Sequence, residues 1–288
     1  MDYILHLGIL ICIYTILAQS LSLVAGYSGQ ISLAQAGFYG IGAYVSALIT
    51  VNLGFSVLLT LPLAMILSGI IAYIVSKVAV KTVDDYYIII TLGIQVVIFS
   101  IMNNWQEVTR GPLGIPRIPS FSIFGLEFDS KISFLLLSVG FVVLVWFILH
   151  HLTKSPFGRV LRGLREDEVY TKSLGKNVGN YKVVSFVISG MLASIAGVLY
   201  AHYISYIDPS SFTINESIFI LSIVIIGGMR KLKEIFFAAA FLVILPEALR
   251  FVGMPSSIAA NMRQIIYGLA LILVIYRMGS KQSIPSAS

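Results

Sequence analysis

The chain has 288 residues, of which 58% are hydrophobic and 11% carry a charge, with a net charge of +6. Soluble domains carry about 25% charged residues, so this composition excludes water as the main solvent and indicates an integral membrane protein. The positive charge does not indicate a nucleic-acid partner, because Lys and Arg lie in the breaks between apolar runs rather than on a soluble module. Membrane lipid is the expected surrounding.

Apolar runs recur along the chain at about the 20 residues that a helix needs to cross a bilayer. They lack the strict alternation of transmembrane barrel strands. The sequence therefore predicts an all-α, polytopic transmembrane helical bundle that forms one membrane domain over residues 1–288. About nine spans are predicted, at 3–24, 31–51, 56–76, 87–103, 132–151, 183–206, 216–229, 235–252 and 262–277.

The positive charges predict how these spans cross the membrane, because cytoplasmic loops are enriched in Lys and Arg. The loops at 77–86, 152–182 and 230–234 and the tail from Arg277 hold most of these residues, so we place them inside the cell. The other side then holds Arg110, Arg117, Lys131, Arg250 and Arg263. The N-terminus is expected outside; it lacks the charged leader of a signal peptide, so the first apolar run is expected to remain as a helix.

Two predicted spans carry signs of interruption. The span 216–229 is short for a full crossing, and residues 26–30, Gly-Tyr-Ser-Gly-Gln, are too small and polar for an ordinary loop. Backbone leaves a helix at membrane depth only where protein or a watery cavity covers it, and transporters place substrate sites at such breaks in corresponding positions of two repeats. We therefore hypothesise discontinuous helices in two related halves of the chain.

Polar side chains gather in the otherwise apolar stretch around the first of these breaks. They are Ser28, Gln30, Ser32, Gln35 and Tyr39, with glycines at 26, 29, 37, 40 and 42 among them. Polar groups there either hold helices together or line a path through the membrane, and their spacing leaves both interpretations open. These five residues and Gln95 are the candidate path residues.

A long segment, 103–131, is predicted on the outer side. Its Gly-Pro turn at 111–112, Pro116 and Pro119 fix its bends, and Trp105 suits the membrane edge. It is either a passive loop or an outer gate or docking surface.

The sequence of the internal segment 153–182 predicts a short amphipathic helix. Ser155-Pro156 suits a helix start, Val160, Leu161 and Leu164 form an apolar stripe, and Gly175 is a natural stop. Its charged residues are Arg159, Arg162 and Arg165, followed by Glu166, Asp167 and Glu168. Such a helix lies on anionic lipid, packs on its own domain or inserts into a groove of a partner, and the sequence alone does not choose.

Enzyme signatures are missing from the sequence. It contains no phosphate-binding loop, no H-E-x-x-H helix and no nucleophile elbow, so no catalytic residue, metal site or cofactor is predicted. Glu247, beside Pro246, is the best intramembrane ionisable candidate. Since carboxylates of a proton relay are lacking, a secondary transporter or channel is less favoured, and an intramembrane enzyme is least favoured.

Six motifs together resemble the permease subunits of bacterial branched-chain amino acid ABC importers, in particular the LivM-type subunit. They are G-Y-S-G-Q-I-S-L-A-Q-A-G-F-Y-G-I-G-A-Y at 26–44, D-Y-Y-I-I-I-T-L-G at 85–93, T-R-G-P-L-G-I-P at 109–116, S-P-F-G-R-V-L-R-G-L-R-E-D-E at 155–168, D-P-S-S-F at 208–212 and L-P-E-A-L-R at 245–250. Each motif is weak alone, but their order and spacing over nearly the whole chain are similar to the family's.

The resemblance implies a permease subunit of the bacterial inner membrane that imports Leu, Ile or Val by alternating access. Its implied partners are a LivH-type permease, two cytoplasmic ATPase subunits and an external binding protein; ATP hydrolysis belongs to the ATPase subunits. The segment 153–182 would be the coupling loop that meets an ATPase, with Arg159, Arg162, Arg165, Glu166, Glu168 and Gly175 as its candidate coupling residues. Urea, a short amide or another amino acid is the alternative cargo.

Two departures from the family's pattern stand out. Tyr170-Thr171 replaces a small Ala-Ala pair in the coupling loop. Four charged residues lie within 230–234, where further small residues usually follow the Gly-Gly pair at 227–228. These charges are expected to stiffen the second break, which leaves open whether it forms.

Overall fold

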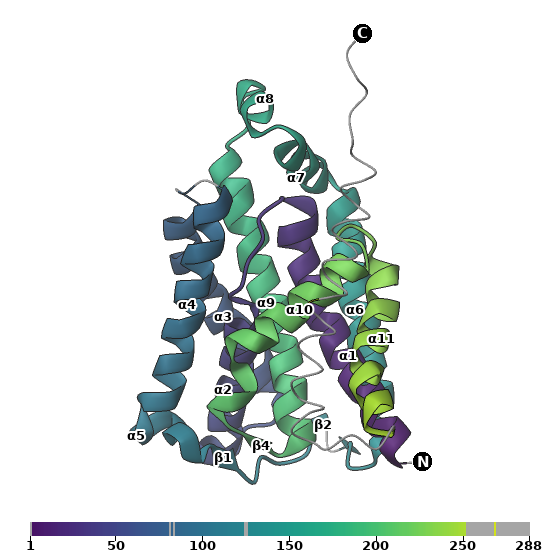
Figure 1. Cartoon of the computed structure of the whole chain (residues 1–288). Helices are drawn as coiled ribbons and strands as arrows, with labels where there is room; N and C mark the ends of the chain where they lie inside the picture. The colour runs from purple at the N-terminus through teal and green to yellow at the C-terminus, as the bar shows by residue number, and fades with distance from the viewer. Residues whose placement is uncertain (1, 81, 83, 124–125, 252–267, 269–288) are drawn as a thin grey trace.

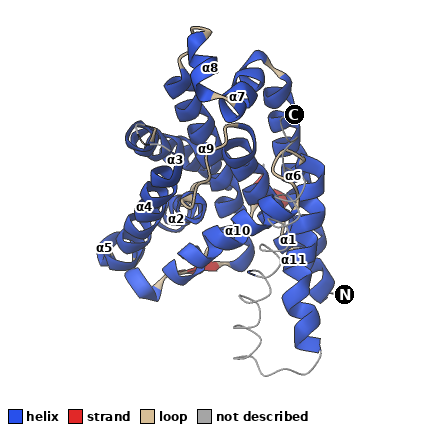
Figure 2. Cartoon of the chain, turned by 45° about the horizontal axis from the view of Figure 1, so that its top comes forward, coloured by secondary structure: helices blue, strands red, loops and turns tan. Residues whose placement is uncertain are grey.

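The computed structural model describes residues 2–80, 82, 84–123, 126–251 and 268. It is a helical bundle (Figures 1 and 2). Its helices are α1 (Asp2–Ser22), continued by the π-helix η1 (Leu23–Tyr27), α2 (Gln35–Leu53), α3 (Val57–Ala79), α4 (Asp84–Asn104), α5 (Gln106–Thr109), α6 (Lys131–Lys154), α7 (Pro156–Glu166), α8 (Glu168–Ser173), α9 (Val178–Ile204), α10 (Ile214–Ile226) and α11 (Leu232–Phe251).

Six described helices are long and apolar enough to cross a bilayer: Asp2–Tyr27, Gln35–Leu53, Val57–Ala79, Tyr86–Asn104, Lys131–Lys154 and Val178–Ile204. They correspond to the first six predicted spans within a few residues, which confirms a polytopic membrane bundle. The predicted spans 216–229 and 235–252 correspond to α10 and α11. The span 262–277 and the tail beyond it lie outside the described residues, so the total of about nine stays a prediction.

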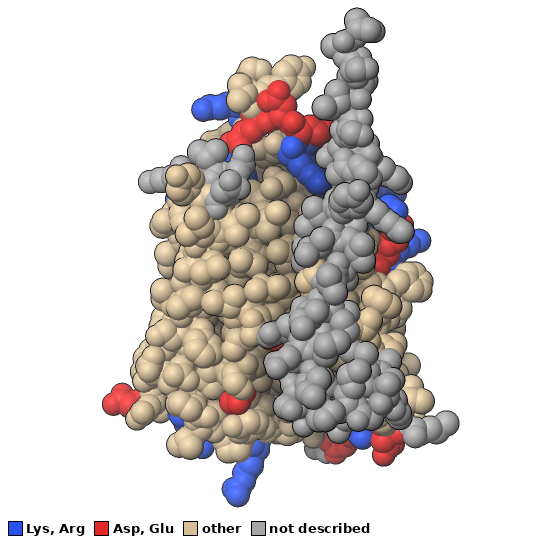
Figure 3. All heavy atoms as spheres, viewed as in Figure 1, with Lys and Arg blue, Asp and Glu red and all other residues tan. Residues whose placement is uncertain are grey.

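The core of the bundle consists of α1, α2 and α9, whose residues are mostly buried. In contrast, α3, α4 and α6 expose large apolar side chains such as Ile74, Ile89 and Leu136. Apolar residues on the outside suit a surface covered by lipid or another membrane subunit. Lys, Arg, Asp and Glu gather near the two ends of the face drawn in Figure 3, with a mainly uncharged belt between them.

Glycines allow α2 and α9 to cross very closely. A Cβ atom added at Gly42 would lie 2.3 Å from the Ser194 carbonyl oxygen, and one at Gly197 would lie 2.1 Å from the Tyr39 carbonyl oxygen. In a membrane, such close backbone approach drives helix association through van der Waals packing. These two positions therefore have no room for a side chain.

The segment 104–131 lies at the end of the bundle opposite α7 and α8, where it packs against the helix ends (Figure 1). It contains α5, the 3₁₀ turn η2 (Gly111–Leu113) and the short strands β1 (Ile115–Pro116), β2 (Ser122–Ile123) and β3 (Leu126–Glu127). β1 pairs antiparallel with β4 (Tyr206–Ile207), which follows α9, and β2 pairs with β3. His202 of α9 also contacts the Pro119 carbonyl oxygen at 2.7 Å. The segment is therefore anchored rather than loose.

Both predicted interruptions are present. After η1 the chain is non-helical from Ser28 to Ala34, so the first break begins later than the predicted residues 26–30, because Gly26 and Tyr27 still belong to the π-helix. α10 has 13 residues, or about 20 Å, less than the ~30 Å of a hydrocarbon core. Gly227 ends it, and Gly228, at φ +80°, turns the chain into α11. The charged residues that follow do not prevent this turn.

Candidate functional site

The first break is buried inside the bundle and held by hydrogen bonds. The Ser28 and Gln30 amides donate to the Leu23 and Val24 carbonyl oxygens at 3.3 and 3.1 Å. Farther on, the Leu33 amide donates to the Thr91 hydroxyl of α4 at 3.1 Å. Backbone groups of the break therefore have hydrogen-bond partners within the bundle, as irregular segments shielded from water require.

The π-helix that leads into the first break touches the turn after α10, far away in sequence, at Gly26. A Cβ atom added there would lie 1.8 Å from the carbonyl oxygen of Met229, in the turn between α10 and α11. The Tyr27 hydroxyl donates to the Arg230 carbonyl oxygen at 3.0 Å. A glycine is thus required at position 26, because any side chain would separate the two interrupted segments.

The end of α7 rests on the same point. The Arg165 guanidinium donates to the Gly26 carbonyl oxygen, and Gly29, at φ +77°, leaves room for the Arg165 side chain. Arg230 reaches the same carbonyl oxygen through Nε at 3.4 Å. Burial and the neighbouring Arg230 charge lower the pKa of Arg165, while Glu166 opposes this shift. Carbonyl oxygens at the end of a helix attract cations. Here the Gly26 carbonyl oxygen accepts hydrogen bonds from two of them, the side chains of Arg165 and Arg230.

The charged residues after the Gly-Gly pair form ion pairs. Arg230 Nη2 lies 3.6 Å from Glu166 Oε1 of α7, and Lys231 pairs with Glu234 at 2.7 Å. Because both pairs are substantially exposed, each contributes at most about 1 kcal/mol. The closely packed contact at Gly26, rather than these ion pairs, is therefore the stronger link among α7, the first break and the turn. We call this contact the three-way junction, defined by Gly26, Arg165 and Met229.

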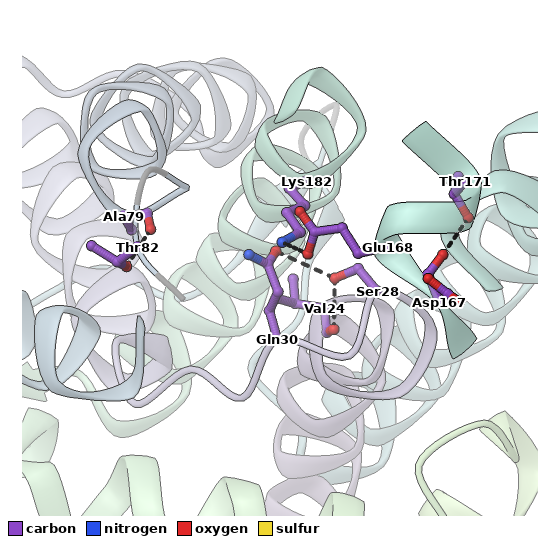
Figure 4. Close-up of polar contacts among 9 residues, drawn as sticks. All are labelled: Val24, Ser28, Gln30, Ala79, Thr82, Asp167, Glu168, Thr171 and Lys182. Atoms are coloured by element: carbon purple, nitrogen blue, oxygen red, sulfur yellow. Dashed lines mark hydrogen bonds and ion pairs between the residues drawn. The ribbon is translucent and has the colours of Figure 1, made fainter. Parts of the chain in front are cut away.

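A second link joins α8 to the start of α9, beside the first break. Glu168 Oε2 accepts from Lys182 Nζ at 2.6 Å, and Lys182, at the start of α9, is buried. In Figure 4 this pair lies beside Ser28 and Gln30, whose Oγ and Oε1 atoms are 3.4 Å apart. Charged and polar groups from three separated segments therefore meet at the α7–α8 end of the bundle.

The segment predicted as one amphipathic helix consists of two helices. Asp167 ends α7 and caps α8, its carboxylate accepting from the Tyr170 amide at 2.8 Å. Of the predicted apolar stripe, Leu161 and Leu164 are buried and Val160 is half-buried. Gly175, at φ +76°, follows the end of α8, as predicted.

The candidate coupling residues divide into two groups. Arg165, Glu166 and Glu168 contact the chain itself, whereas Arg159 and Gly175 are exposed and Arg162 is half-exposed. Val169, Tyr170 and Leu174 are the exposed large apolar residues of this segment. The sequence analysis noted Tyr170 only as a departure from the family's pattern and did not single out Val169 or Leu174, although each stands close to charged residues in the sequence.

All six candidate path residues are buried, but they fall into separate groups rather than one cluster. Ser28 and Gln30 lie near Lys182, and the Ser32 hydroxyl accepts from the Ala34 amide. The Gln35 amide donates to the Ser20 hydroxyl between α1 and α2, where Ser189 of α9 also approaches. This geometry favours a role for Gln35 in holding helices together over a role in lining a path.

Tyr39 and Gln95 meet around Phe212, which the sequence analysis did not single out beyond its motif. Phe212 ends the short 3₁₀ helix η3 (Pro209–Phe212) and is fully buried. Its ring centroid lies 5.0 Å from that of Tyr39, and its carbonyl oxygen accepts from Gln95 Nε2 at 2.8 Å. A phenylalanine in a Pro- and Ser-containing loop gave no sequence signal that it would be drawn inward.

Other ionisable candidates have structural partners. The Tyr3 hydroxyl donates to the Glu247 carboxylate, joining α1 to α11. His202 is buried and also contacts the Ser46 hydroxyl at 2.8 Å. Over the described ranges, no group of three metal-ligating side chains comes together.

Two interrupted helices that meet beneath an amphipathic helix define a polytopic membrane protein of the transporter class. Residues 3–275 match the family described as the permease component of branched-chain amino acid transport systems, and the chain belongs to this family. The predicted resemblance is therefore confirmed. Permease subunits of this family are not enzymes, which agrees with the prediction for this chain.

The chain is similar to several permeases. It is 34% identical to the high-affinity branched-chain amino acid permease LivM of Salmonella typhimurium, over 92% of this chain and 66% of that protein. It is 24% identical to the probable LivH permease of Methanocaldococcus jannaschii, over 90% of this chain and 83% of that protein. The chain thus spans about two thirds of the LivM length. No solved structure matches it.

Proposed function

We propose that this chain is the LivM-type half of an ABC importer that carries Leu, Ile or Val across the inner membrane. The match of residues 3–275 to the permease family carries this proposal. A LivH-type permease would supply the other half, two cytoplasmic ATPase subunits the energy, and an external binding protein the substrate. The similarity to a LivH permease supports a paralogous partner.

The site suggests how ATP hydrolysis would reach the membrane. The exposed part of 153–182, including Arg159, Val169 and Tyr170, would contact an ATPase subunit. Arg165 and Glu168 would pass the movement to the first break and to Lys182. Access would then alternate along a path near residues 28–39 and Gln95, within one membrane domain of about nine spans.

The arrangement relative to the membrane can be tested by cysteine labelling. The proposed orientation puts α8 and the C-terminal tail in the cytoplasm and the N-terminus and segment 104–131 outside, as the positive-inside rule favours. Ser173 and Ser120 are exposed, and Cys12, the only cysteine of the sequence, is buried. In a Cys12→Ser background, a membrane-impermeant maleimide added to intact cells should label Ser120→Cys and spare Ser173→Cys. Labelling of Ser173→Cys but not of Ser120→Cys would show that the chain has the opposite orientation.

The function is tested by reconstituting the chain with its candidate partners in liposomes. Leucine, isoleucine or valine, presented by the binding protein, should stimulate ATP hydrolysis several-fold above the basal rate, whereas a complex with an inactivated ATPase should show none. Stimulation by urea or another solute alone would support the importer assignment and show that its substrate is not Leu, Ile or Val. A similar protein, a tyrosine transport permease of Clostridioides difficile, matches 38% of this chain, so tyrosine belongs in the panel. Uptake without ATPase subunits would favour a channel or secondary transporter.

A further inference from the structure

Phe212 fills an aromatic pocket at the end of the bundle opposite α7. Its ring centroid lies 5.0, 5.9 and 6.2 Å from those of Tyr39, Tyr44 and Tyr200, on α2 and α9. Gly40 forms the floor: a Cβ atom there would lie 2.9 Å from Phe212 Cγ. The absent side chain at position 40 therefore creates the space that the phenyl ring occupies.

Two polar side chains at this apolar pocket each have an atom that lacks a hydrogen-bond partner among the described residues. Gln95 is fully buried; its Nε2 atom donates to the Phe212 carbonyl oxygen, but its Oε1 atom has no hydrogen-bond partner within the described part of the chain. The buried Tyr44 hydroxyl has none there either. Buried amide and hydroxyl groups are nearly always paired, so two groups beside one pocket that are unpaired over the described ranges point to a functional role.

The segment that carries Phe212 is suited to withdraw. It runs from Asp208, just after the anchored strand β4, to Thr213, whose side chain does not cap α10. The Phe212 ring packs inward, and two side chains hydrogen-bond to the segment: Gln95 Nε2 donates to the Phe212 carbonyl oxygen, and the Tyr200 hydroxyl donates to Ser211 Oγ at 3.4 Å. The Ser210 and Ser211 hydroxyls donate locally to Asp208. A displacement of residues 209–213, with β4 kept in place by β1, would therefore break the Gln95 and Tyr200 hydrogen bonds and empty the pocket.

α10 connects this pocket to the three-way junction. Its first residue lies two positions after Phe212, and the turn after its last residue carries Met229, which packs against Gly26. A 13-residue helix moves as a rigid body, so a shift at the junction would be transmitted to Phe212. Figure 1 shows α10 crossing the bundle obliquely between these two places.

We propose that Phe212 occupies the place of the substrate's side chain, and that the pocket binds an apolar α-amino acid when Phe212 withdraws. Tyr39, Tyr200 and Gly40 would surround the aliphatic side chain. Gln95 would accept a hydrogen bond from the ammonium group through Oε1 and donate to the carboxylate through the freed Nε2. The Tyr44 hydroxyl would donate to the same carboxylate. This site rests on the proposed function, since it assigns the substrate position of that importer.

Direct binding tests the site without relying on transport. The permease complex is purified without ATP or binding protein, and equilibrium binding of radiolabelled L-leucine is measured for wild type and Phe212→Ala. In the wild type, the binding-competent state, in which Phe212 has left the pocket, is only rarely populated, and this rarity lowers the apparent affinity for leucine. Phe212→Ala removes the occupant, so the variant should bind leucine at least about tenfold more tightly. Unlabelled L-valine should compete, and urea should not.

A matched pair of variants tests the polar contacts. In the Phe212→Ala background, Gln95→Leu should abolish the gain. Gln19→Leu is the control, because Gln19 is also buried, donates through Nε2 to a carbonyl oxygen, that of Leu232, and has an unpartnered Oε1 within the described residues. It lies outside the pocket and should leave the gain intact. Equal loss in both variants, or a gain that survives Gln95→Leu, would overturn the assignment.

Two further outcomes separate the site from the importer function. If Phe212→Ala fails to assemble with its partners, Phe212→Leu replaces it and should show a gain for L-alanine larger than that for L-leucine, because the leucine side chain fills part of the pocket. No gain for either amino acid would refute the site, even where binding-protein-stimulated ATP hydrolysis is intact. Gln95-dependent binding in a complex that never shows stimulation would support the site and refute the importer assignment.

Discussion

Replacing Gly26 with alanine is expected to stop ATP-driven uptake while the protein remains in the membrane. The new Cβ atom would lie 1.8 Å from the Met229 carbonyl oxygen, which belongs to backbone and cannot rotate away. The turn after α10 would have to separate from the first break, and the Gly26 carbonyl oxygen would leave Arg165. All contacts of the three-way junction would therefore change together.

The size of this effect follows from the cost of overpacking. Forcing an extra methyl group into a filled space costs about 1–3 kcal/mol, and about 1.4 kcal/mol corresponds to a factor of ten. Reconstituted Gly26→Ala should therefore lose at least about fivefold of its stimulated uptake, while the basal ATPase rate changes little, because hydrolysis is proposed to occur in other subunits. Uptake and ATP hydrolysis measured on the same liposomes give the ratio directly.

Gly140→Ala provides the control. Gly140 lies on α6, is exposed, and has nothing within 4 Å of an added Cβ atom. Membrane yield and assembly with the partners should be equal for both variants. Wild-type coupling in Gly26→Ala would mean that the junction does not transmit movement, and coupling would then have to pass through the Glu168–Lys182 link alone.

The membrane spans could be predicted because their signal is local. Long apolar runs with few charges identify a spanning helix without any knowledge of its neighbours. The same holds for the breaks: glycines and polar residues at 26–30 and the short run before Gly227 mark positions where a helix cannot continue. The π-helix that carries the first helix on to Tyr27 left no such mark.

The meeting of the two breaks could not be predicted, since it depends on how distant segments pack. Arg230 illustrates this: as one of several charges it indicated a stiff, poorly formed turn, but its guanidinium pairs with Glu166 of α7 and leaves Gly228 free to turn the chain. Phe212 is a second case. Its inward position is fixed by the missing side chain of Gly40, on a helix far away in sequence.

The candidate coupling residues were predicted as one group because they lie close together in sequence, between positions 159 and 175. Asp167 divides them by ending α7 and capping α8, so that Arg165 and Glu168 contact different parts of the bundle. A cap of this kind is visible in sequence only as one more acidic residue after Glu166. The functional division therefore becomes clear only once the two helices are placed.

Valine in place of Gly197 is expected to prevent the bundle from forming. A side chain at position 197 would begin 2.1 Å from the Tyr39 carbonyl oxygen and 2.7 Å from the Ala43 amide nitrogen, both backbone atoms of α2. The crossing is reciprocal, since Gly42 meets α9 equally closely at Ser194. In lipid the hydrophobic effect does not drive helices together, so packing lost at this crossing is not replaced.

The comparison of Gly197→Val with Gly93→Val isolates this packing from helix propensity. Both changes put a β-branched residue into a membrane helix, but Gly93 is exposed on α4 with nothing within 4 Å of an added Cβ atom. Because overpacking against backbone exceeds the usual 1–3 kcal/mol, Gly197→Val should reduce the detergent-extracted monodisperse protein at least about tenfold, and Gly93→Val should not. Size-exclusion chromatography of fluorescent fusions measures both. Equal profiles would mean that α2 and α9 can separate without loss of the fold, and that the core lies elsewhere in the bundle.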